Sequence, residues 1–433
     1  MRDTIPVSRM PDPTDWPDPI DQAACHGLVG DILRTIEPHS EADPVAILVQ
    51  LLAAFGNVVG PQPHWFAEAD RHSLKLFTVL VGTSSKGRKG ASWGHVRRLF
   101  ECVDPGWAAD RILSGLSTGE GLIWQVRDPI TKHNAIREGK GKDRKIVGYE
   151  DVEIDGGVSD KRLLIVESEF CRVLKVMARD TNTLSPVIRN AWDQDHLKTL
   201  TKNEPATATG THISMIGHIT RDELCRNLTQ TEAGNGFGNR FLWMCVRRSK
   251  SLPEGGSLSQ ADLAPLVERL RAAVAHAQQV AELRRDDDSL ELWKAVYPEL
   301  SEGKRGLLGA MTSRAEAQVM RLACIYALLG QSNVVGVDHL KAALAVWKYA
   351  EDSTCYIFGG KQGDPIGETI LTNLRDRLPD SLTQTQISRL FNGHQDASRI
   401  HQALVVLERD GLVKQRTEHT PGRSTTLWSA TER

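Results

Sequence analysis

Short apolar runs alternate with longer segments of helical periodicity over the first half of the chain. Apolar residues at helical spacing predict helices over Gln22–Ile36 and Ala42–Val59. Three runs have the length of buried strands, Leu74–Val81, Leu163–Val166 and Ile213–Ile216, and polar residues follow soon after each of them. This alternation predicts an α/β fold with a parallel sheet. Since the carboxyl ends of parallel strands face the ligand crevice, we expect these polar residues to converge on one site.

The second half of the chain is largely helical and ends in a small unit of its own. From Leu263 to Tyr356 the pattern predicts an all-α subdomain, and a glycine-rich break, 359–365, follows. Helices are then predicted over Ile366–Leu378, Gln384–Phe391 and Ala397–Asp410, before two short strands. Three helices and a β-hairpin in this order predict a winged helix-turn-helix. We therefore expect an N-terminal arm with helices (1–60), an α/β core (61–255), a helical subdomain (256–358) and a winged helix (366–433).

Composition and charge narrow the classes of function. The chain has 433 residues, which excludes a small stapled scaffold, and 53 basic against 55 acidic side chains give a formal charge of −2. Because so weak a field does not attract nucleic acid, any polyanion must bind to local basic patches. The seven cysteines contain no C-x-x-C pair, which argues against a zinc cluster or a disulfide framework. With neither a signal-peptide pattern nor an apolar run of membrane-spanning length, we expect a cytoplasmic protein that does not bind a membrane.

A glycine-rich turn follows the first predicted strand and precedes a helix, which is the context of a phosphate-binding loop. Such a loop wraps phosphates in backbone amides, neutralises charge with a lysine and holds Mg²⁺ with a hydroxyl. Here Arg88 stands at the usual lysine position, Lys89 comes one position late and Ser92 supplies the hydroxyl. We expect Lys89 to contact the nucleotide; a basic glycine turn without a ligand is the alternative. The predicted nucleotide contacts in this turn are Gly82, Ser85, Gly87, Arg88, Lys89, Gly90 and Ser92, of which Ser92 is also a predicted Mg²⁺ ligand.

Acidic residues follow the second predicted strand, and a histidine lies near the end of the third. Glu167 and Glu169 are similar to a Walker B pair, in which one carboxylate organises Mg²⁺ and the other activates the attacking water. We assign Glu167 to the metal and Glu169 to the water; a solvated turn is the alternative. His218 occupies the place of a residue that senses the γ-phosphate, unless its role is structural. Arg221 and Arg240 are candidates for a trans-acting arginine finger, with surface ion pairs as the alternative.

Basic residues in loops are candidates for contact with DNA. The 126–162 segment lacks apolar periodicity and predicts an exposed loop or hairpin, with Lys140 and Lys142 among its basic residues. Lys198 and Lys202 lie between the second and third core strands, where we expect a pore-lining loop. Ordinary solvated loops are the alternative for both segments. In the C-terminal unit the predicted contacts are Arg399 and Gln402 on the recognition helix and Lys414 and Arg416 in the wing, with protein docking as the alternative.

Six ordered strings carry a resemblance to a known family: VGTSSKGRKGASW, SGLSTGEGLIWQVRDP, LLIVESEF, HISMIGHITRDEL, NGFGNRFLW and RAEAQVMRLACIYALL. They resemble the helicase-like P-loop ATPases, a domain-of-unknown-function family found with primase domains in phages, plasmids and integrated elements. The resemblance covers roughly Glu41–Phe358. It implies a RecA/AAA+-like P-loop NTPase core with an α-helical lid, which uses ATP and Mg²⁺, forms a homo-oligomeric ring, with a hexamer favoured, and moves on single-stranded DNA. It also implies Lys89 as the phosphate lysine, Glu167 as the Walker B acid, Arg240 as a conspicuous arginine and Arg314 or Arg321 on the lid helix.

Together these features predict an ATP-dependent DNA translocase or helicase of replicative type, from a phage, plasmid or integrated mobile element. Its expected partner is single-stranded DNA or replication-origin DNA. No primase motifs precede the core, so primer synthesis would need a separate primase. The alternative is a nucleotide-regulated DNA-binding or defence switch without unwinding activity. A third hypothesis, motivated by the unusual spelling of the Walker motifs, is a scaffold that does not turn over ATP.

Overall fold

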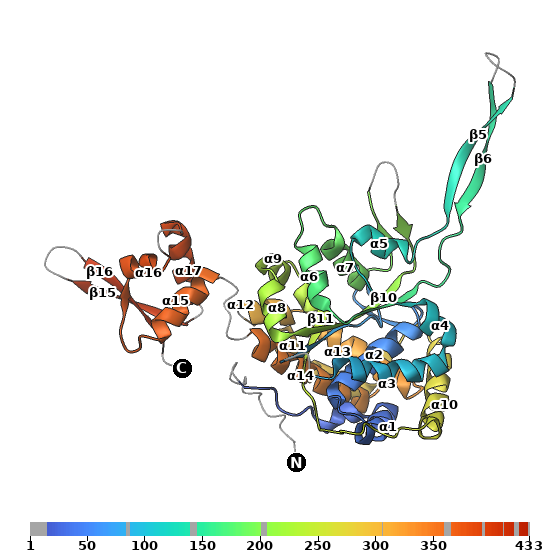
Figure 1. The fold of residues 1–433 in the computed structure, drawn as a ribbon, viewed down its shortest axis with the longest axis horizontal. Coiled ribbons are helices and arrows are strands. Elements are labelled where there is room, and N and C mark those ends of the chain that lie inside the picture. Colours follow the sequence, from blue (N-terminus) through green and yellow to red (C-terminus); the bar gives the residue numbers. More distant parts are fainter. Residues whose placement is uncertain are drawn as a thin grey trace.

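A parallel sheet lies at the centre of the protein. The computed structural model describes residues 15–83, 87–138, 145–200, 206–304, 306–358, 365–391, 395–409, 411–419 and 424–431. Its central sheet has five parallel strands in the order β11-β3-β10-β7-β4 (Figure 1). They are β3 (Phe77–Gly82), β4 (Ile112–Leu113), β7 (Arg162–Glu167), β10 (His212–Thr220) and β11 (Phe241–Val246). The mixed α/β class with a parallel sheet is therefore confirmed.

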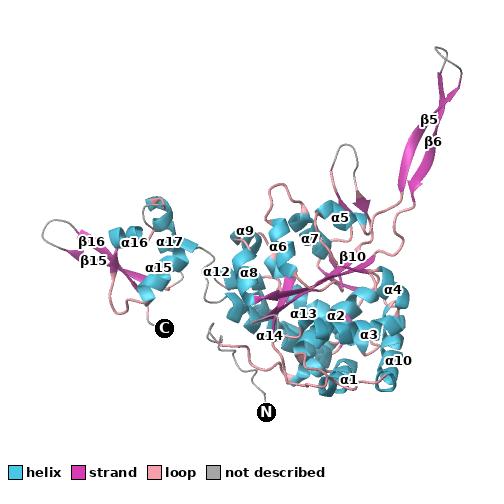
Figure 2. Ribbon diagram, in the orientation of Figure 1, coloured by secondary structure: helices cyan, strands magenta, loops and turns pink. Residues whose placement is uncertain are grey.

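Both faces of this sheet are buried, which explains why its strands are continuous apolar runs. Successive side chains of a strand point to opposite faces, and in β3 Val79 and Val81 join one hydrophobic cluster while Leu80 joins the other. The first cluster includes α5 (Gly119–Trp124), α6 (Phe170–Met177) and α7 (Leu184–Asp193). The second includes α1 (Gly27–Ile36), α2 (Pro44–Val58), α3 (Lys89–Val103), α10 (Gln260–Ala277), α13 (Ala315–Leu329) and α14 (Val337–Phe358). Figure 2 shows these helices around the sheet.

The N-terminal helices form where the periodicity predicts them, with boundaries set by local chemistry. Helix α2 begins at Pro44, whose fixed φ suits the first turn, and the Asp43 side chain accepts a hydrogen bond from the amide of Val45. Helices α10, α13 and α14, which belong to the predicted helical subdomain, pack into the same cluster as α2 and α3. These helices therefore share a core with the sheet.

A long hairpin extends away from the body of the protein between α5 and β7 (Figure 1). Its strands β5 (Ile130–Glu138) and β6 (Lys145–Asp155) pair in antiparallel fashion. The sequence predicted an exposed loop or hairpin in this segment, and the described part is a hairpin. Its predicted DNA contacts, Lys140 and Lys142, lie outside the described residues.

The C-terminal unit folds around a hydrophobic cluster of its own, in which Trp428 and Leu404 are buried. Its helices are α15 (Pro365–Arg375), α16 (Gln384–Arg389) and α17 (Ala397–Arg409). They accompany an antiparallel sheet in the order β14 (Leu382–Thr383), β16 (Ser424–Ala430) and β15 (Val413–His419). A capping box at Thr383 and Gln386 fixes the start of α16. Three helices and the two longer strands follow one another in the predicted order.

The other described helices are α4 (Pro105–Asp110), α8 (Arg221–Asn227), α9 (Gln230–Gly234), α11 (Asp287–Ser301), α12 (Gly306–Thr312) and the 3-10 turns Gln22–Cys25, Glu37–His39 and Gly238–Arg240. The other strands are β1 (His64–Ala67), β2 (Asp70–Ser73), β8 (Leu197–Lys198), β9 (Thr207–Ala208), β12 (Arg284–Arg285) and β13 (Val334–Val335). Among the helices that the structure describes, none is long and apolar enough to span a membrane.

Candidate functional site

The strand order creates a ligand crevice between β3 and β10. After β3 the chain passes the positions of β10 and β7 and forms β4 at one edge of the sheet. After β10 it passes β3 and forms β11 at the other edge. Open α/β sheets bind ligands at such a switch point, outside the carboxyl ends of the strands. A cavity of about 780 Å³ lies there. It is lined by Arg88, Lys89 and Gly90 from the start of α3, by Ser168 and Glu169 after β7, and by His218 and Thr220 at the end of β10.

The cavity receives the amino-terminal end of α3. This helix has 15 residues and begins at Lys89, directly after Arg88, which has a left-handed φ of 54°. The first-turn amides of a helix lack intrahelical partners, and the helix dipole favours an anion beside them. Burial lowers the pKa of Lys89, while the Glu223 carboxylate opposes that shift. Gly82 ends β3 and Gly87 precedes Arg88, whereas Ser85 lies outside the described residues.

A buried hydrogen-bond network links α3 to β10 through α2. Gln50 donates its side-chain amide to the carbonyl of Ala46 at 2.8 Å and to the Ser92 hydroxyl at 2.7 Å. The other polar atom of the Gln50 side chain, Oε1, can only accept a hydrogen bond, and it lies 3.0 Å from Nε2 of His218. Nε2 is therefore the ring nitrogen of His218 that carries the proton. Burial, with the charge of Lys89, lowers the pKa of His218 to about 4, and the ring is neutral. The Ser92 hydroxyl donates to the Lys89 carbonyl at 2.6 Å, so this predicted Mg²⁺ ligand takes part in the network below the first turn of α3.

The two predicted Walker B carboxylates have different surroundings. Glu167 is buried, and its Oε1 accepts hydrogen bonds from the amides of Gly115, at 2.6 Å, and Leu116, at 2.7 Å. Those amides belong to the loop after β4. Glu169 is exposed at the start of α6 and lines the cavity. The structure thus brings Glu169 to Lys89 and His218, whereas it directs one oxygen of Glu167 to a neighbouring loop.

Two cations on α6 were not singled out from the sequence. Arg172 and Lys175 stand three residues apart, so they share a helix face, and both line the cavity. With Arg88 and Lys89 they give the lining four cationic side chains, against the carboxylates Glu169 and Glu223. Their spacing on a helix that directly follows the acidic strand end was the available signal. The balance of charge favours a polyanionic ligand.

The predicted arginines occupy other places. Arg221 begins α8, where its Nη2 donates to the carbonyl of Tyr356 at 3.0 Å and its guanidinium lies 4.6 Å from that ring centre. Arg240 precedes β11, so it lies at the amino-terminal edge of the sheet, away from the cavity. It is buried there and forms an ion pair with Asp193 at 2.5 Å, and Arg314 pairs with the same carboxylate at 3.0 Å. Arg321 is buried nearby, with its guanidinium 3.5 Å from the centre of the Trp192 ring that Arg240 and Arg314 also face.

The candidates for DNA contact that the structure describes are exposed. Lys198 lies in β8, on a short hairpin, and Lys202 lies outside the described residues. Arg399 and Gln402 are on the exposed side of α17. Lys414 and Arg416 are exposed on β15, and Arg416 lies 4.0 Å from Glu418. These positions leave each side chain accessible to a large ligand.

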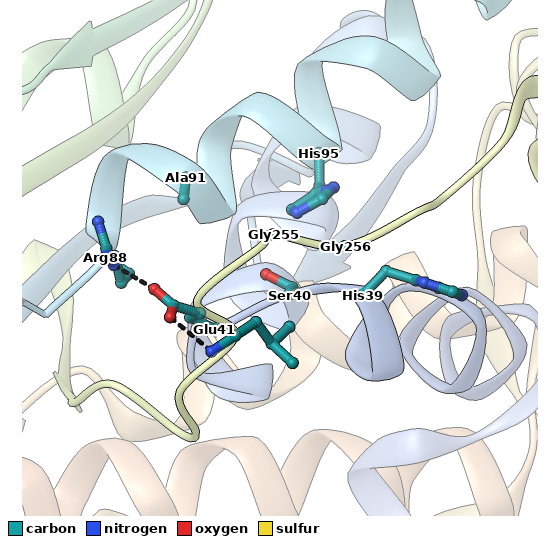
Figure 3. A pocket seen from close by; sticks show the side chains of 9 residues that line it. His39, Ser40, Glu41, Arg88, Ala91, His95, Gly255 and Gly256 are labelled. Carbon is teal, nitrogen blue, oxygen red and sulfur yellow. Dashed lines mark hydrogen bonds and ion pairs between the residues drawn. The ribbon is translucent and has the colours of Figure 1, made fainter.

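A second, smaller cavity of about 280 Å³ adjoins the first, because Arg88 and Ala91 line both (Figure 3). Glu41 lies in its wall, where it forms an ion pair with Nε of Arg88 at 2.6 Å and accepts a hydrogen bond from the amide of Leu252 at 2.7 Å. The Leu252 amide and the Arg248 guanidinium hold the pKa of Glu41 below its usual value. The smaller cavity therefore has a fixed carboxylate at its border with the larger one.

Comparison with protein-family models and with curated proteins finds no match for this chain. Within the described residues, no three or more His, Cys, Asp or Glu side chains are grouped so that they could hold a metal ion.

Proposed function

We propose that this chain is a P-loop ATPase that binds Mg²⁺·ATP in the larger cavity. The observation that carries the proposal is the meeting of the α3 amino terminus, Lys89, Glu169 and His218 around one cavity, at the switch point of a parallel sheet. Helix termini and lysines bind phosphates, and a carboxylate facing the same space can activate water. The sheet is compatible with a Rossmann-like or RecA-like core.

In this proposal the residues of the cavity have different roles in phosphoryl transfer. The amides at the start of α3 and the charges of Arg88 and Lys89 bind the phosphates and neutralise the transition state. Glu169 orients a water molecule and accepts its proton as the water oxygen attacks the γ-phosphorus. The bond from the γ-phosphorus to the bridging oxygen breaks, which leaves ADP and phosphate. Glu167 stays a candidate for Mg²⁺ coordination through water. The Ser92 hydroxyl is fully buried and bonded to Gln50 and to the Lys89 carbonyl, so it is not assigned to the metal.

We further propose that ATP hydrolysis drives movement on single-stranded DNA. In this scheme the chains form a homo-oligomeric ring in which Arg221 acts on a neighbouring nucleotide, and Lys198 contacts the strand. Arg240 is buried and paired with Asp193, and Arg314 pairs with the same carboxylate, so neither is assigned to the nucleotide. The C-terminal unit acts as a winged helix, supported by its three helices, its antiparallel sheet and its exposed Arg399 and Lys414.

All seven cysteines are free thiols, which supports a reducing cytoplasm.

A nucleotide-regulated DNA-binding switch is the second candidate function. The C-terminal unit has a hydrophobic cluster of its own, which favours this function. A unit with its own core can bind duplex DNA without any movement driven by ATP hydrolysis at the parallel sheet. Duplex binding that responds to ATP, without unwinding, would distinguish this switch from a translocase.

The proposal is tested by ATP hydrolysis of the full chain with and without single-stranded DNA. We expect hydrolysis to require Mg²⁺, to accelerate with DNA, and to fall by roughly 10²–10³-fold in Lys89→Ala, because that substitution removes a charge from the phosphate site. Arg97→Ala, an exposed change on the same helix, is the matched control and should keep the wild-type rate. Hydrolysis that Lys89→Ala leaves unchanged would contradict the proposal.

A further inference from the structure

The smaller cavity lies beside the larger cavity, which is the proposed phosphate site, and is separate from it. Its walls come from three segments that are distant in sequence: 39–41, the first turns of α3, and the loop 252–256 that follows β11 (Figure 3). Two imidazole rings line it, His39 from the first segment and His95 from α3. Figure 3 shows His39, Ser40 and the glycine pair Gly255 and Gly256 on the side of the cavity that faces α3. The cavity is therefore a meeting point of α3 with two loops.

The cavity is preformed by close packing of its loops. A β-carbon on Gly256 would lie 2.0 Å from the carbonyl oxygen of His39, so only glycine permits the two backbones to approach this closely. The amide of Ser257 donates to Nδ1 of His39 at 3.3 Å, which fixes that ring against the loop. Burial, reinforced by Arg98 and His39, lowers the pKa of His95, so its ring is neutral at pH 7. The neutral ring of His95 in this cavity is suited to contact with a flat aromatic ligand.

Arg88 stands at the border of the two cavities. Its backbone has a φ of 54°, which is uncommon for a residue other than glycine, and its side chain is tied to Glu41 at 2.6 Å. Glu41 is itself held by Arg248 and by the amide of Leu252. This chain of contacts joins the phosphate-facing end of α3 to the loop that closes the smaller cavity. A ligand that spans both cavities would pass Arg88.

From this adjacency we infer that the smaller cavity binds the nucleoside half of the nucleotide, with the base against His95 and His39, while the larger cavity binds its phosphates. The inference rests on the proposed function and deepens it, because it assigns the base and sugar to residues outside the phosphate site. Its ligand class is a nucleoside triphosphate, as opposed to an inorganic polyphosphate. His95 and His39 are then positioning residues that set affinity and base preference, and they take no part in the transfer of the phosphoryl group.

The test compares the binding of Mg²⁺·ATP and Mg²⁺·tripolyphosphate to the full chain by calorimetry. Tripolyphosphate has the phosphates of ATP without its nucleoside. We expect wild type to bind ATP more tightly than tripolyphosphate. In His95→Ala the affinity for ATP should fall by about 10-fold, through loss of base stacking, while the affinity for tripolyphosphate stays constant. Arg97→Ala, on the outward side of α3, is the matched control and should change neither.

Each outcome separates this inference from the proposed function. Equal binding of ATP and tripolyphosphate by wild type, or equal loss of both in His95→Ala, would overturn the nucleoside site and leave the phosphate site intact. Binding of neither ligand by wild type would overturn the proposed function itself. Because His95→Ala could disturb α3, a thermal melt checks its fold, and His39→Ala provides a second variant with the same expected pattern.

Discussion

At the scale of single residues, Glu169 and Glu167 have different surroundings, and the proposed function gives them different roles. Glu169 faces the cavity, so Glu169→Gln should bind Mg²⁺·ATP with near wild-type affinity and lose roughly 10²–10⁴-fold in the rate of hydrolysis, because it cannot accept the proton of water. Calorimetry and a phosphate-release assay on the same preparation measure the two quantities. A variant that retains turnover would assign the base elsewhere.

Glu167→Ala is the informative comparison for that variant. The buried Glu167 carboxylate accepts the amides of Gly115 and Leu116, and its removal leaves two backbone donors without a partner. Each such donor costs about 1–3 kcal/mol, so we expect Glu167→Ala to lower the free energy of unfolding by roughly 2–6 kcal/mol. Glu169→Gln should leave that free energy unchanged. Chemical denaturation followed by tryptophan fluorescence distinguishes the two effects.

Three histidines, of which His212 and His218 are buried and His72 is partly buried, make stability sensitive to acid. Burial lowers the pKa of His72 to about 4, of His212 to about 3 and of His218 to about 4. All three are neutral in the folded chain, whereas the unfolded chain takes up protons as the pH falls below about 6.5. The unfolded state therefore gains stability between pH 6.5 and 4, by about 1.4 kcal/mol per pH unit for each histidine. We expect the melting temperature to fall as the pH is lowered from 7 to 5. The control variant His196→Ala, which changes an exposed histidine, should show the same fall. A melting temperature that stays constant over this pH range would contradict the expectation.

At the scale of elements, one buried amide holds α2 and α4 to the sheet. Asn57 is fully buried; its Nδ2 donates to the carbonyls of Leu163, in β7, and His212, in β10, each at 3.0 Å, and its Oδ1 accepts from Nε1 of Trp107 at 2.9 Å. Asn57→Leu has a similar volume and removes all three bonds. We expect it to cost roughly 2–5 kcal/mol of stability, measured by urea denaturation, because buried groups are left unpaired. An unchanged midpoint would show that these groups find other partners.

The elements that could be predicted from the sequence are those whose signal is local. The apolar run of β3, the polar ends of β7 and β10 and the helical repeat of α2 follow from residues close in the chain, and the structure confirms that the three strand ends share one edge. Strand β4, with two residues, carries no periodicity, and it exists because it pairs with β7.

The site was only partly predictable, because sequence position does not give side-chain direction. Lys89, Glu169 and His218 were predicted and lie together around the cavity. Arg240 was conspicuous in the sequence, but its partner, Asp193, comes from a helix 47 residues earlier in the chain, and only the tertiary fold places the two together. Arg172 and Lys175 are candidates because α6 faces the cavity, and that orientation depends on the tertiary fold.

At the scale of the whole molecule, the C-terminal unit and the sheet domain are predicted to have separable roles. Arg399 and Arg416 are exposed on a unit with its own core, so Arg399→Glu with Arg416→Glu should weaken binding to DNA by at least 10-fold and reduce its salt dependence, because phosphate contacts release counterions. ATP hydrolysis without DNA should persist at the wild-type rate. Fluorescence anisotropy with labelled DNA measures the first effect. Unchanged affinity would favour a protein-docking role for this unit.

We propose that the amino terminus of α3 and the carboxyl end of β7 hold a nucleoside triphosphate between them. The most direct measurement is a cryo-EM map of the full chain with Mg²⁺ and a non-hydrolysable ATP analogue. We expect the phosphates against Lys89 and the first amides of α3, with Glu169 facing the γ-phosphate. A map with the phosphates bound elsewhere, or with Lys89 and Glu169 turned away from them, would contradict the account.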